Sequence, residues 1–149
     1  QKHVLDTARL QACEQVFAKF GLDKVKTVGD AIVAVGGLAR PTPEAVKSCV
    51  SASFMLRDIA NAFEPSFGFH VGIHIGSLVA GTVGKSNVQF DILGKDVNTA
   101  FNICDLSESD QILLSSDAWR HVRNDVAAKS AGLARLKSGQ DIELFECGV

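Results

Sequence analysis

Two charged side chains that could do chemistry lie in one short stretch of this 149-residue sequence. Residues 24–37 read KVKTVGDAIVAVGG, in which runs rich in β-branched residues flank the pair Gly29-Asp30. This pattern is typical of a tight β-hairpin. Asp30 has two interpretations, because aspartate suits turns in its own right and because a carboxylate fixed at a hairpin tip can bind a metal ion. Lys26 lies on the same predicted ribbon, near that tip.

Other polar residues also fall in predicted strands. Asp91 interrupts the apolar run VQFDILG, where it is either exposed on the other strand face or an acceptor for a hydrogen bond from a ligand. His70 and His74 project to the same side of the predicted strand FGFHVGIHIG. A metal site there lacks a further His, Cys or Glu at a ligand spacing, so a polar strand face is the favoured interpretation.

The stretch AGTVGKS resembles the end of a phosphate-binding P-loop without meeting its requirements. The P-loop needs a glycine five positions before Gly84, and that position is Val79. The stretch also leads to a predicted strand, whereas a P-loop opens a helix. Neither GxSxG nor HExxH occurs, so nothing in the sequence supports a hydrolase triad.

Hydrophobic periodicity predicts how these residues are positioned. Helical spacing and alternation indicate a single α+β domain over residues 1–149, a sheet with helices packed on it. Helices are expected at about 4–20, 44–63, 95–105 and 116–123, and strands at about 24–28, 31–35, 67–76, 88–93, 112–115, 133–137 and 142–146.

Composition limits the function further. With 46% hydrophobic residues the chain can build a core, and with a net charge of −2 and no basic block it is not expected to bind nucleic acid. No apolar run is long enough to cross a bilayer. The four cysteines are far apart and form no CxxC pair, which predicts reduced, mostly buried thiols. The expected location is cytoplasmic, either for the whole protein or for the cytosolic part of a membrane-bound one.

Three motifs in order, KVKTVGDAIVAVGGL, HVGIHIGSLVAGTVG and QFDILGKDVNTA, closely resemble the catalytic domain of class III nucleotidyl cyclases. The resemblance runs from about Gln11 to Glu146. It implies a ferredoxin-like sandwich of a mostly antiparallel sheet with packed helices, here lacking the family's first strand, so that the domain is N-terminally incomplete. It also implies conversion of a nucleoside triphosphate to a 3′,5′-cyclic nucleotide and pyrophosphate.

The resemblance assigns roles to the polar residues. Asp30 matches the second of two aspartates that hold two divalent cations, Mg²⁺ or Mn²⁺, during attack of the ribose 3′-oxygen on the α-phosphorus. Lys26 and Asp91 match the pair that reads the base. Lysine can donate to adenine N1 and a carboxylate can accept from the N6 amino group, whereas guanine reverses that pattern. ATP is therefore the expected substrate.

Further positions both match the family and depart from it. Asn98 matches the asparagine that positions the ribose, and Lys137 is near the lysine that contacts the terminal phosphates. Asn102 occupies the position of the transition-state arginine, whose charge a neutral amide cannot replace; Arg120 or Arg123 would have to substitute. The family's first metal aspartate lies in an early strand typically reading DIxGFT, and the 29 residues ahead of Asp30 contain no such motif.

The resemblance implies a site shared between two subunits, one giving the metal aspartates and the other the base-reading pair and Asn98. The first hypothesis is an adenylate cyclase that makes cyclic AMP for signalling, as a homodimer or a heterodimer with another cyclase domain, attached to sensor domains in the intact protein. The alternative is a degenerate cyclase-homology domain that binds nucleotide or pairs with an active partner. A packing module with no nucleotide role is the third and least favoured hypothesis.

Overall fold

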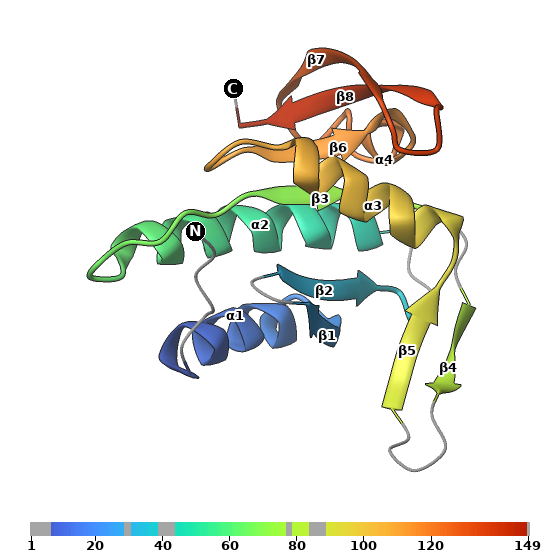
Figure 1. Ribbon diagram of the computed structural model, residues 1–149. Helices are drawn as coiled ribbons and strands as arrows, with labels where there is room; N and C mark the ends of the chain where they lie inside the picture. The colour runs from blue at the N-terminus through green and yellow to red at the C-terminus, as the bar shows by residue number, and fades with distance from the viewer. Residues whose placement is uncertain (1–6, 29–30, 39–43, 77–78, 84–88, 149) are drawn as a thin grey trace.

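The computed structural model describes residues 7–28, 31–38, 44–76, 79–83 and 89–148, with the backbone alone for 79–83 and 89–93. Helices and strands are interspersed along the chain (Figure 1). The elements are α1 (Thr7–Lys19), β1 (Leu22–Val28), β2 (Ala31–Gly36), α2 (Ala45–Ala62), β3 (Val71–Ile73), β4 (Val79–Val83), β5 (Gln89–Leu93), α3 (Lys95–Leu106), β6 (Ile112–Ser115), α4 (Ser116–Arg120), β7 (Ala128–Arg135) and β8 (Asp141–Cys147).

The described strands form three sheets rather than the single sheet expected from the sequence. One sheet has the order β3-β6-β8-β7, with β3 parallel to β6 and the other neighbours antiparallel. β1 pairs with β2, and β4 with β5, as two antiparallel ribbons. The expected α+β fold with mostly antiparallel pairing is therefore confirmed. β2 and β3 both pack against α2, but no described strand pairs with both of them, so the ribbon and the larger sheet stay separate.

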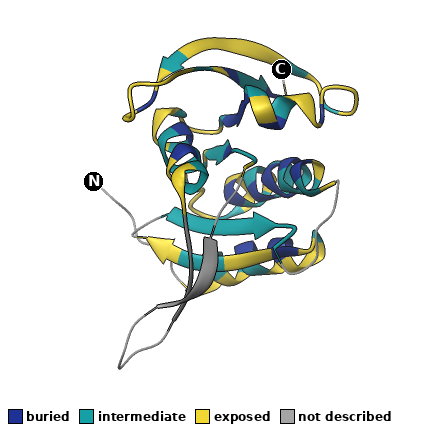
Figure 2. Cartoon of the chain, turned by 90° about the vertical axis from the view of Figure 1, so that its right-hand side faces the viewer, coloured by how far each residue is buried: buried dark blue, intermediate teal, exposed yellow. Residues whose placement is uncertain are grey.

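Helices cover both faces of the four-stranded sheet. Ile112 and Leu114 of β6 are fully buried and pack with residues of α2 and α4. Leu113, which lies between them, packs instead with Ile103 of α3. Side chains alternate along a strand, so this apolar run is buried on both faces, as is typical of a central strand. Figure 2 shows buried residues on α2 and on part of α3, and many exposed ones on β7.

A second core holds the ribbon β1–β2 against α1 and α2. Ile32 and Ala34 of β2 are partly buried against it. Its buried members come from three elements: Cys13, Val16 and Phe17 of α1, Leu22 of β1, and Ala52 and Leu56 of α2. The ribbon that carries Lys26 is thus fixed to the domain through one of its two faces.

Glycine allows α3 to lie directly on β3. A Cβ atom added at Gly72 would lie 2.4 Å from the Cys104 backbone nitrogen and 2.9 Å from the Ala100 carbonyl oxygen. Real Cβ atoms do not approach backbone that closely, so only glycine permits this contact. The backbone of α3, the helix that carries Asn98 and Asn102, therefore packs directly against the backbone of β3.

Every helix and strand that was expected from the sequence has a counterpart in the structure, although some boundaries differ. The strand expected at 67–76 is assigned only at Val71–Ile73, although the Phe69 carbonyl still accepts the Asp110 N–H. The strand β4 was not expected, because the glycines in this stretch favoured sharp turns. The strand β7 begins earlier than predicted, at Ala128. None of the described helices combines the length and apolar character needed to cross a membrane.

Candidate functional site

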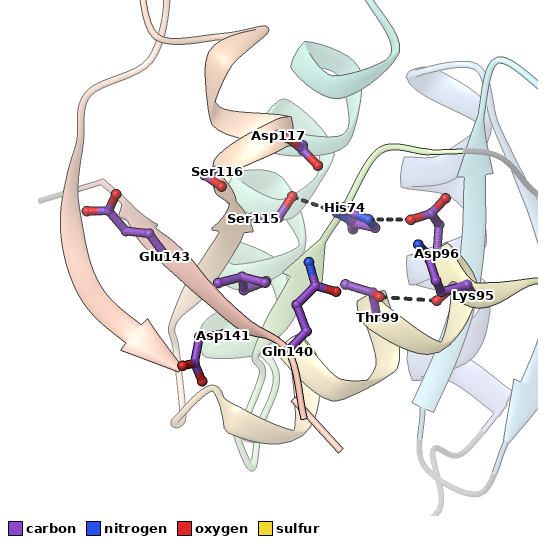
Figure 3. A pocket seen from close by; sticks show the side chains of 11 residues that line it. His74, Lys95, Asp96, Thr99, Ser115, Ser116, Asp117, Gln140, Asp141 and Glu143 are labelled. Carbon is purple, nitrogen blue, oxygen red and sulfur yellow. Dashed lines mark hydrogen bonds and ion pairs between the residues drawn. The ribbon is translucent and has the colours of Figure 1, made fainter. Parts of the chain in front are cut away.

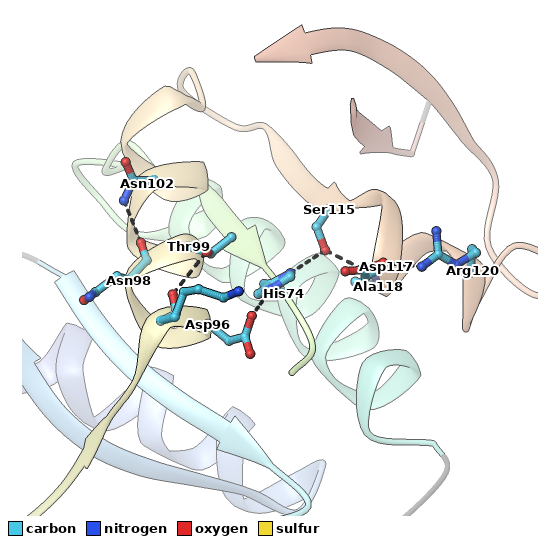
Figure 4. Close-up of polar contacts among 10 residues, drawn as sticks. His74, Asp96, Asn98, Thr99, Asn102, Ser115, Asp117, Ala118 and Arg120 are labelled. Atoms are coloured by element: carbon cyan, nitrogen blue, oxygen red, sulfur yellow. Dashed lines mark hydrogen bonds and ion pairs between the residues drawn. The ribbon is translucent and has the colours of Figure 1, made fainter. Parts of the chain in front are cut away.

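The two predicted asparagines lie one turn apart on α3. The Asn98 N–H donates to the Gly94 carbonyl at 3.2 Å, which closes the first turn of the helix. Asn98 itself is exposed. Asn102 is half-buried, and its Nδ2 donates to the Asn98 carbonyl at 2.7 Å (Figure 4). The Asn102 side chain is therefore hydrogen-bonded to the backbone of Asn98, one turn before it in the helix.

Asn102 also holds the β7–β8 turn against α3. Its Oδ1 accepts the backbone N–H of Lys137 at 3.0 Å. The Lys137 ammonium is exposed and lies 3.7 Å from Asp105 Oδ2. Asn98, Asn102 and Lys137, which were predicted from separate parts of the sequence, are thus brought together. Asn102 uses both ends of its amide for contacts within the chain, and it adds no positive charge to the group.

A β-bulge in β1 determines on which face of the ribbon Lys26 lies. Lys24 pairs with Ala34 and Lys26 pairs with Val33, so the register shifts between the two lysines. Directly paired residues share a face, and successive residues of β2 alternate. Lys24 therefore lies on the α1 side, where its Nζ is 2.6 Å from Glu14 Oε2. Lys26 lies on the opposite face, as expected when a bulge re-aims a side chain.

The two predicted carboxylates are placed only in part. Asp30 lies outside the described residues. Asp91 is in β5, where its backbone pairs with Gly81 of β4, and its side chain is outside the description. β5 contacts β1, which brings the strand of Asp91 beside that of Lys26, and Gly94 then leads from β5 into α3. Asp91, one of the predicted base-reading pair, is therefore on the strand that leads directly into the helix of Asn98.

The two histidines bind α3 rather than sharing one ligand site. The His74 side chain is 6% exposed, and its Nε2 lies 2.9 Å from Asp96 Oδ1 in the first turn of α3. His70 Nδ1 lies 3.1 Å from the Cys104 carbonyl and 2.6 Å from Ser107 Oγ, at the other end of the helix. Within the described ranges no three His, Cys, Asp or Glu side chains converge to hold a metal ion.

Asp96, His74 and Ser115 are a group that the sequence did not reveal. His74 Nδ1 is 2.7 Å from Ser115 Oγ, so the three side chains stand in the order of a carboxylate–histidine–serine triad. Ser115 is only 2% exposed, however, and its Oγ accepts the Ala118 N–H at 3.1 Å as the cap of α4. A serine held in this way is a structural partner and not an attacking group. The alternation of His and Gly in HVGIHIG was the signal that could have found the network.

A polar cleft of about 280 Å³ borders this network, beside Asp96 and Thr99 of α3 (Figure 3). Four of its lining residues carry carboxylates, and none of the predicted site residues whose side chains the structure describes lines it. Arg120, one of the arginines considered as a substitute for the missing one, pairs with Asp117 on α4. Figure 4 shows that pair on the far side of His74 from Asn102. The cleft is therefore separate from the described residues of the predicted nucleotide site. Its lining residues are His74, Lys95, Asp96, Thr99, Ser115, Ser116, Asp117, Gln140, Asp141, Ile142 and Glu143.

Burial lowers the reactivity of three of the four cysteines. All four are free, two of them buried and two half-buried. Burial raises the pKa of Cys49 to about 11 and that of Cys147 to about 12. Burial also raises the pKa of Cys13. Because the thiolate is the reactive form, these thiols are poor nucleophiles at neutral pH.

The sequence is similar to known proteins over most of its length. Residues 7–146 match the family model described as the adenylate and guanylate cyclase catalytic domain. An adenylate cyclase of Mycobacterium bovis is 25% identical over 130 residues, which are 85% of this chain and 29% of that protein. A receptor-type guanylate cyclase of Caenorhabditis elegans is 35% identical over 103 residues, 64% of this chain and 10% of that protein. The chain thus spans less than a third of the length of either relative.

Solved structures share the fold. The guanylate cyclase domain of RhGC from Catenaria anguillulae, in complex with GTP, has a TM-score of 0.87 at 19% identity, covering 95% of this chain and 80% of that one. The adenylyl cyclase CyaB from P. aeruginosa has a TM-score of 0.85 at 18% identity, covering 95% and 79%. At these identities the likeness concerns the fold, and the similar proteins include both adenylate and guanylate cyclases.

Proposed function

Since the chain belongs to the family of adenylate and guanylate cyclase catalytic domains, we propose that it is an adenylate cyclase, which converts ATP to 3′,5′-cyclic AMP and pyrophosphate. The observation that supports ATP most strongly is the placement of Lys26. The bulge in β1 turns this lysine away from α1, and β1 contacts the strand of Asp91. Lys26 then donates to adenine N1, and Asp91 accepts from the N6 amino group.

Asn98 and Lys137 bind the rest of the nucleotide in this proposal. Asn98 is exposed on the first turn of α3 and orients the ribose, whose 3′-oxygen must lie in line with the α-phosphorus. The Lys137 ammonium binds the terminal phosphates, and the contact between its backbone N–H and Asn102 keeps the turn in place. Asn102 therefore serves the site by holding Lys137 beside Asn98.

Asp30 is the residue of this chain that would hold a divalent cation. Mg²⁺ and Mn²⁺ prefer oxygen ligands, and the carboxylate of this residue fits that preference. Two such ions, when bound, would neutralise the phosphates and favour ionisation of the 3′-hydroxyl. The sequence contains no DIxGF motif to supply the family's other metal aspartate, so Asp30 is one carboxylate of that pair.

Two copies of the chain would share each site. In a two-fold homodimer, Asp30 of one copy faces Lys26, Asp91 and Asn98 of the other, and symmetry produces two equivalent sites. A heterodimer with another cyclase domain would keep one such site. One similar structure is a non-canonical dimeric guanylyl cyclase domain from Blastocladiella emersonii, and two others from that fungus are monomeric.

Asn102 supports a second candidate function. Its neutral amide, already bonded to Asn98 and Lys137, supplies no charge to a transition state. A degenerate cyclase-homology domain, which binds nucleotide or pairs with an active partner in a regulatory role, would tolerate this substitution.

Product analysis separates the two functions. The full-length protein is incubated with Mn²⁺ and either ATP or GTP, and cyclic nucleotide and pyrophosphate are quantified by chromatography, with a chelator-treated sample as the control. We expect cyclic AMP from ATP, with cyclic GMP formed on the order of 100-fold more slowly because two base contacts are mismatched. Folded, dimeric protein that binds ATP and yields no cyclic product would contradict the enzyme function and support the regulatory one.

A further inference from the structure

One side of β3 and its extension is built to hold α3. Side chains alternate along a strand, so every second residue from position 70 shares this side. Each of the four contacts α3: His70 and His74 through their rings, and Gly72 and Gly76 by close approach. At Gly76 the close neighbour is the Asp96 side chain, because a Cβ atom there would overlap its carboxylate. This row, His70, Gly72, His74 and Gly76, is named the α3 cradle.

His74 makes the most deeply buried polar contact of the cradle, and its neighbours determine its tautomer. The Asp96 carboxylate can only accept, so His74 Nε2 carries a ring proton and donates it to Oδ1. In the neutral ring Nδ1 is then the acceptor for the hydroxyl proton of Ser115, whose Oγ also accepts the Ala118 N–H. The network therefore runs from the cap of α4, through the ring, to the first turn of α3.

The network is coupled by the helix to Asn98. Asp96 and Asn98 are two residues apart, so they project about 200° apart around the same turn. Figure 4 shows His74 and Asp96 on one side of α3 and Asn98 on the other. Asp96 is half-buried beside β3, whereas Asn98 is exposed. A rotation of this turn about the helix axis that follows loss of the Asp96 contact must move the Asn98 amide.

We propose that His74 is a positioning residue: by donating from Nε2 to Asp96 it fixes the first turn of α3, and with it the amide of Asn98 that orients the ribose. This inference rests on the proposed function for its kinetic part, since Asn98 is assigned to substrate there. The cradle contacts themselves do not depend on that assignment. His70, which binds the far end of the same helix, is the natural comparison because it anchors α3 without lying beside Asn98.

Two conservative variants separate the two sides of the ring. His74→Gln can place an amide N–H where Nε2 stands and keep the bond to Asp96. His74→Asn keeps a polar atom near Nδ1, facing Ser115, but is too short to reach Asp96. His70→Ala removes the contacts at the other end of the helix and serves as the control for helix docking alone.

The kinetic test measures kcat and KM of the full-length protein with Mn-ATP. We expect His74→Asn to lower kcat by about 10- to 100-fold, because a misplaced contact reduces the share of bound nucleotide in reactive geometry. His74→Gln and His70→Ala should stay within about threefold of the parent protein, and His74→Asn should add little to Asn98→Ala, as two changes acting through one contact do. Equal losses in His74→Gln and His74→Asn, or full additivity with Asn98→Ala, would overturn the proposal.

Hydrogen exchange tests the positioning without relying on activity. In His74→Asn the amides of residues 98–102 should exchange at least about tenfold faster than in the parent protein, while His74→Gln should protect them. Unchanged exchange in His74→Asn would overturn the positioning role. If the parent protein forms no cyclic product, the proposed function fails at that point, and the exchange result still decides whether His74 fixes the turn.

Discussion

Replacing Asp30 by asparagine is expected to lower the rate of cyclic AMP formation by on the order of 100- to 1,000-fold, because a lost metal carboxylate removes several kcal/mol of charge stabilisation. Asparagine keeps the size of the side chain and its suitability for a turn, so the hairpin should survive. The rate is measured with saturating Mn-ATP, and folding is checked by circular dichroism and thermal unfolding.

Asp23→Asn is the matched control for this prediction. Asp23 is exposed in β1, at the end of the ribbon away from the tip, and pairs there with Val35. The same loss of charge at that position should leave the rate within about twofold, as is usual for a surface substitution. If Asp30→Asn retained parental activity, Asp30 would be a turn residue, and the metal assignment would be wrong.

Changing Lys26 to glutamate together with Asp91 to cysteine is expected to transfer substrate preference from ATP towards GTP. Glutamate can accept from the guanine N1–H and N2 amino groups, whereas the original pair presents a donor to a donor and an acceptor to an acceptor. Two corrected contacts should move the ratio of kcat/KM for the two nucleotides by on the order of 100-fold. The ratio is measured with both nucleotides in one reaction.

The bulge in β1 supplies the control for the base-pocket change. Lys24 is on the same strand but on the opposite face, bonded to Glu14. Lys24→Gln should therefore leave the ratio unchanged. An unaltered preference for ATP in the double variant, with folded protein, would show that Lys26 and Asp91 do not read the base.

Local sequence signals predicted most helices and strands, because each depends on near neighbours. The helix at Ala45–Ala62 and the strand at Ile112–Ser115 appear where the periodicity placed them. The separation into three sheets could not be predicted, since it depends on which strands meet in space. β4 was missed because Gly81 favours a turn in sequence, whereas in the structure it pairs with Asp91.

The contacts among the candidate site residues could not be predicted. Family motifs assigned roles to Asn98, Asn102 and Lys137 one by one, but nothing in the sequence shows that the Asn102 amide bonds to the backbones of both of the others. The contacts of His74 with Asp96 and Ser115 span 22 and 41 positions in the chain. Such pairs follow from the packing of α3 and β6 around β3, which no local pattern encodes.

One catalytic site is expected to need Asp30 from one copy of the chain and Asn98 from another. Asp30→Asn and Asn98→Ala proteins with different affinity tags are co-expressed, and mixed dimers are isolated by sequential purification on both tags. Each variant alone should be nearly inactive. In a mixed dimer one of the two sites is intact, so we expect about half of the parental rate of cyclic AMP formation per dimer. Mixed dimers no more active than either variant alone would contradict it.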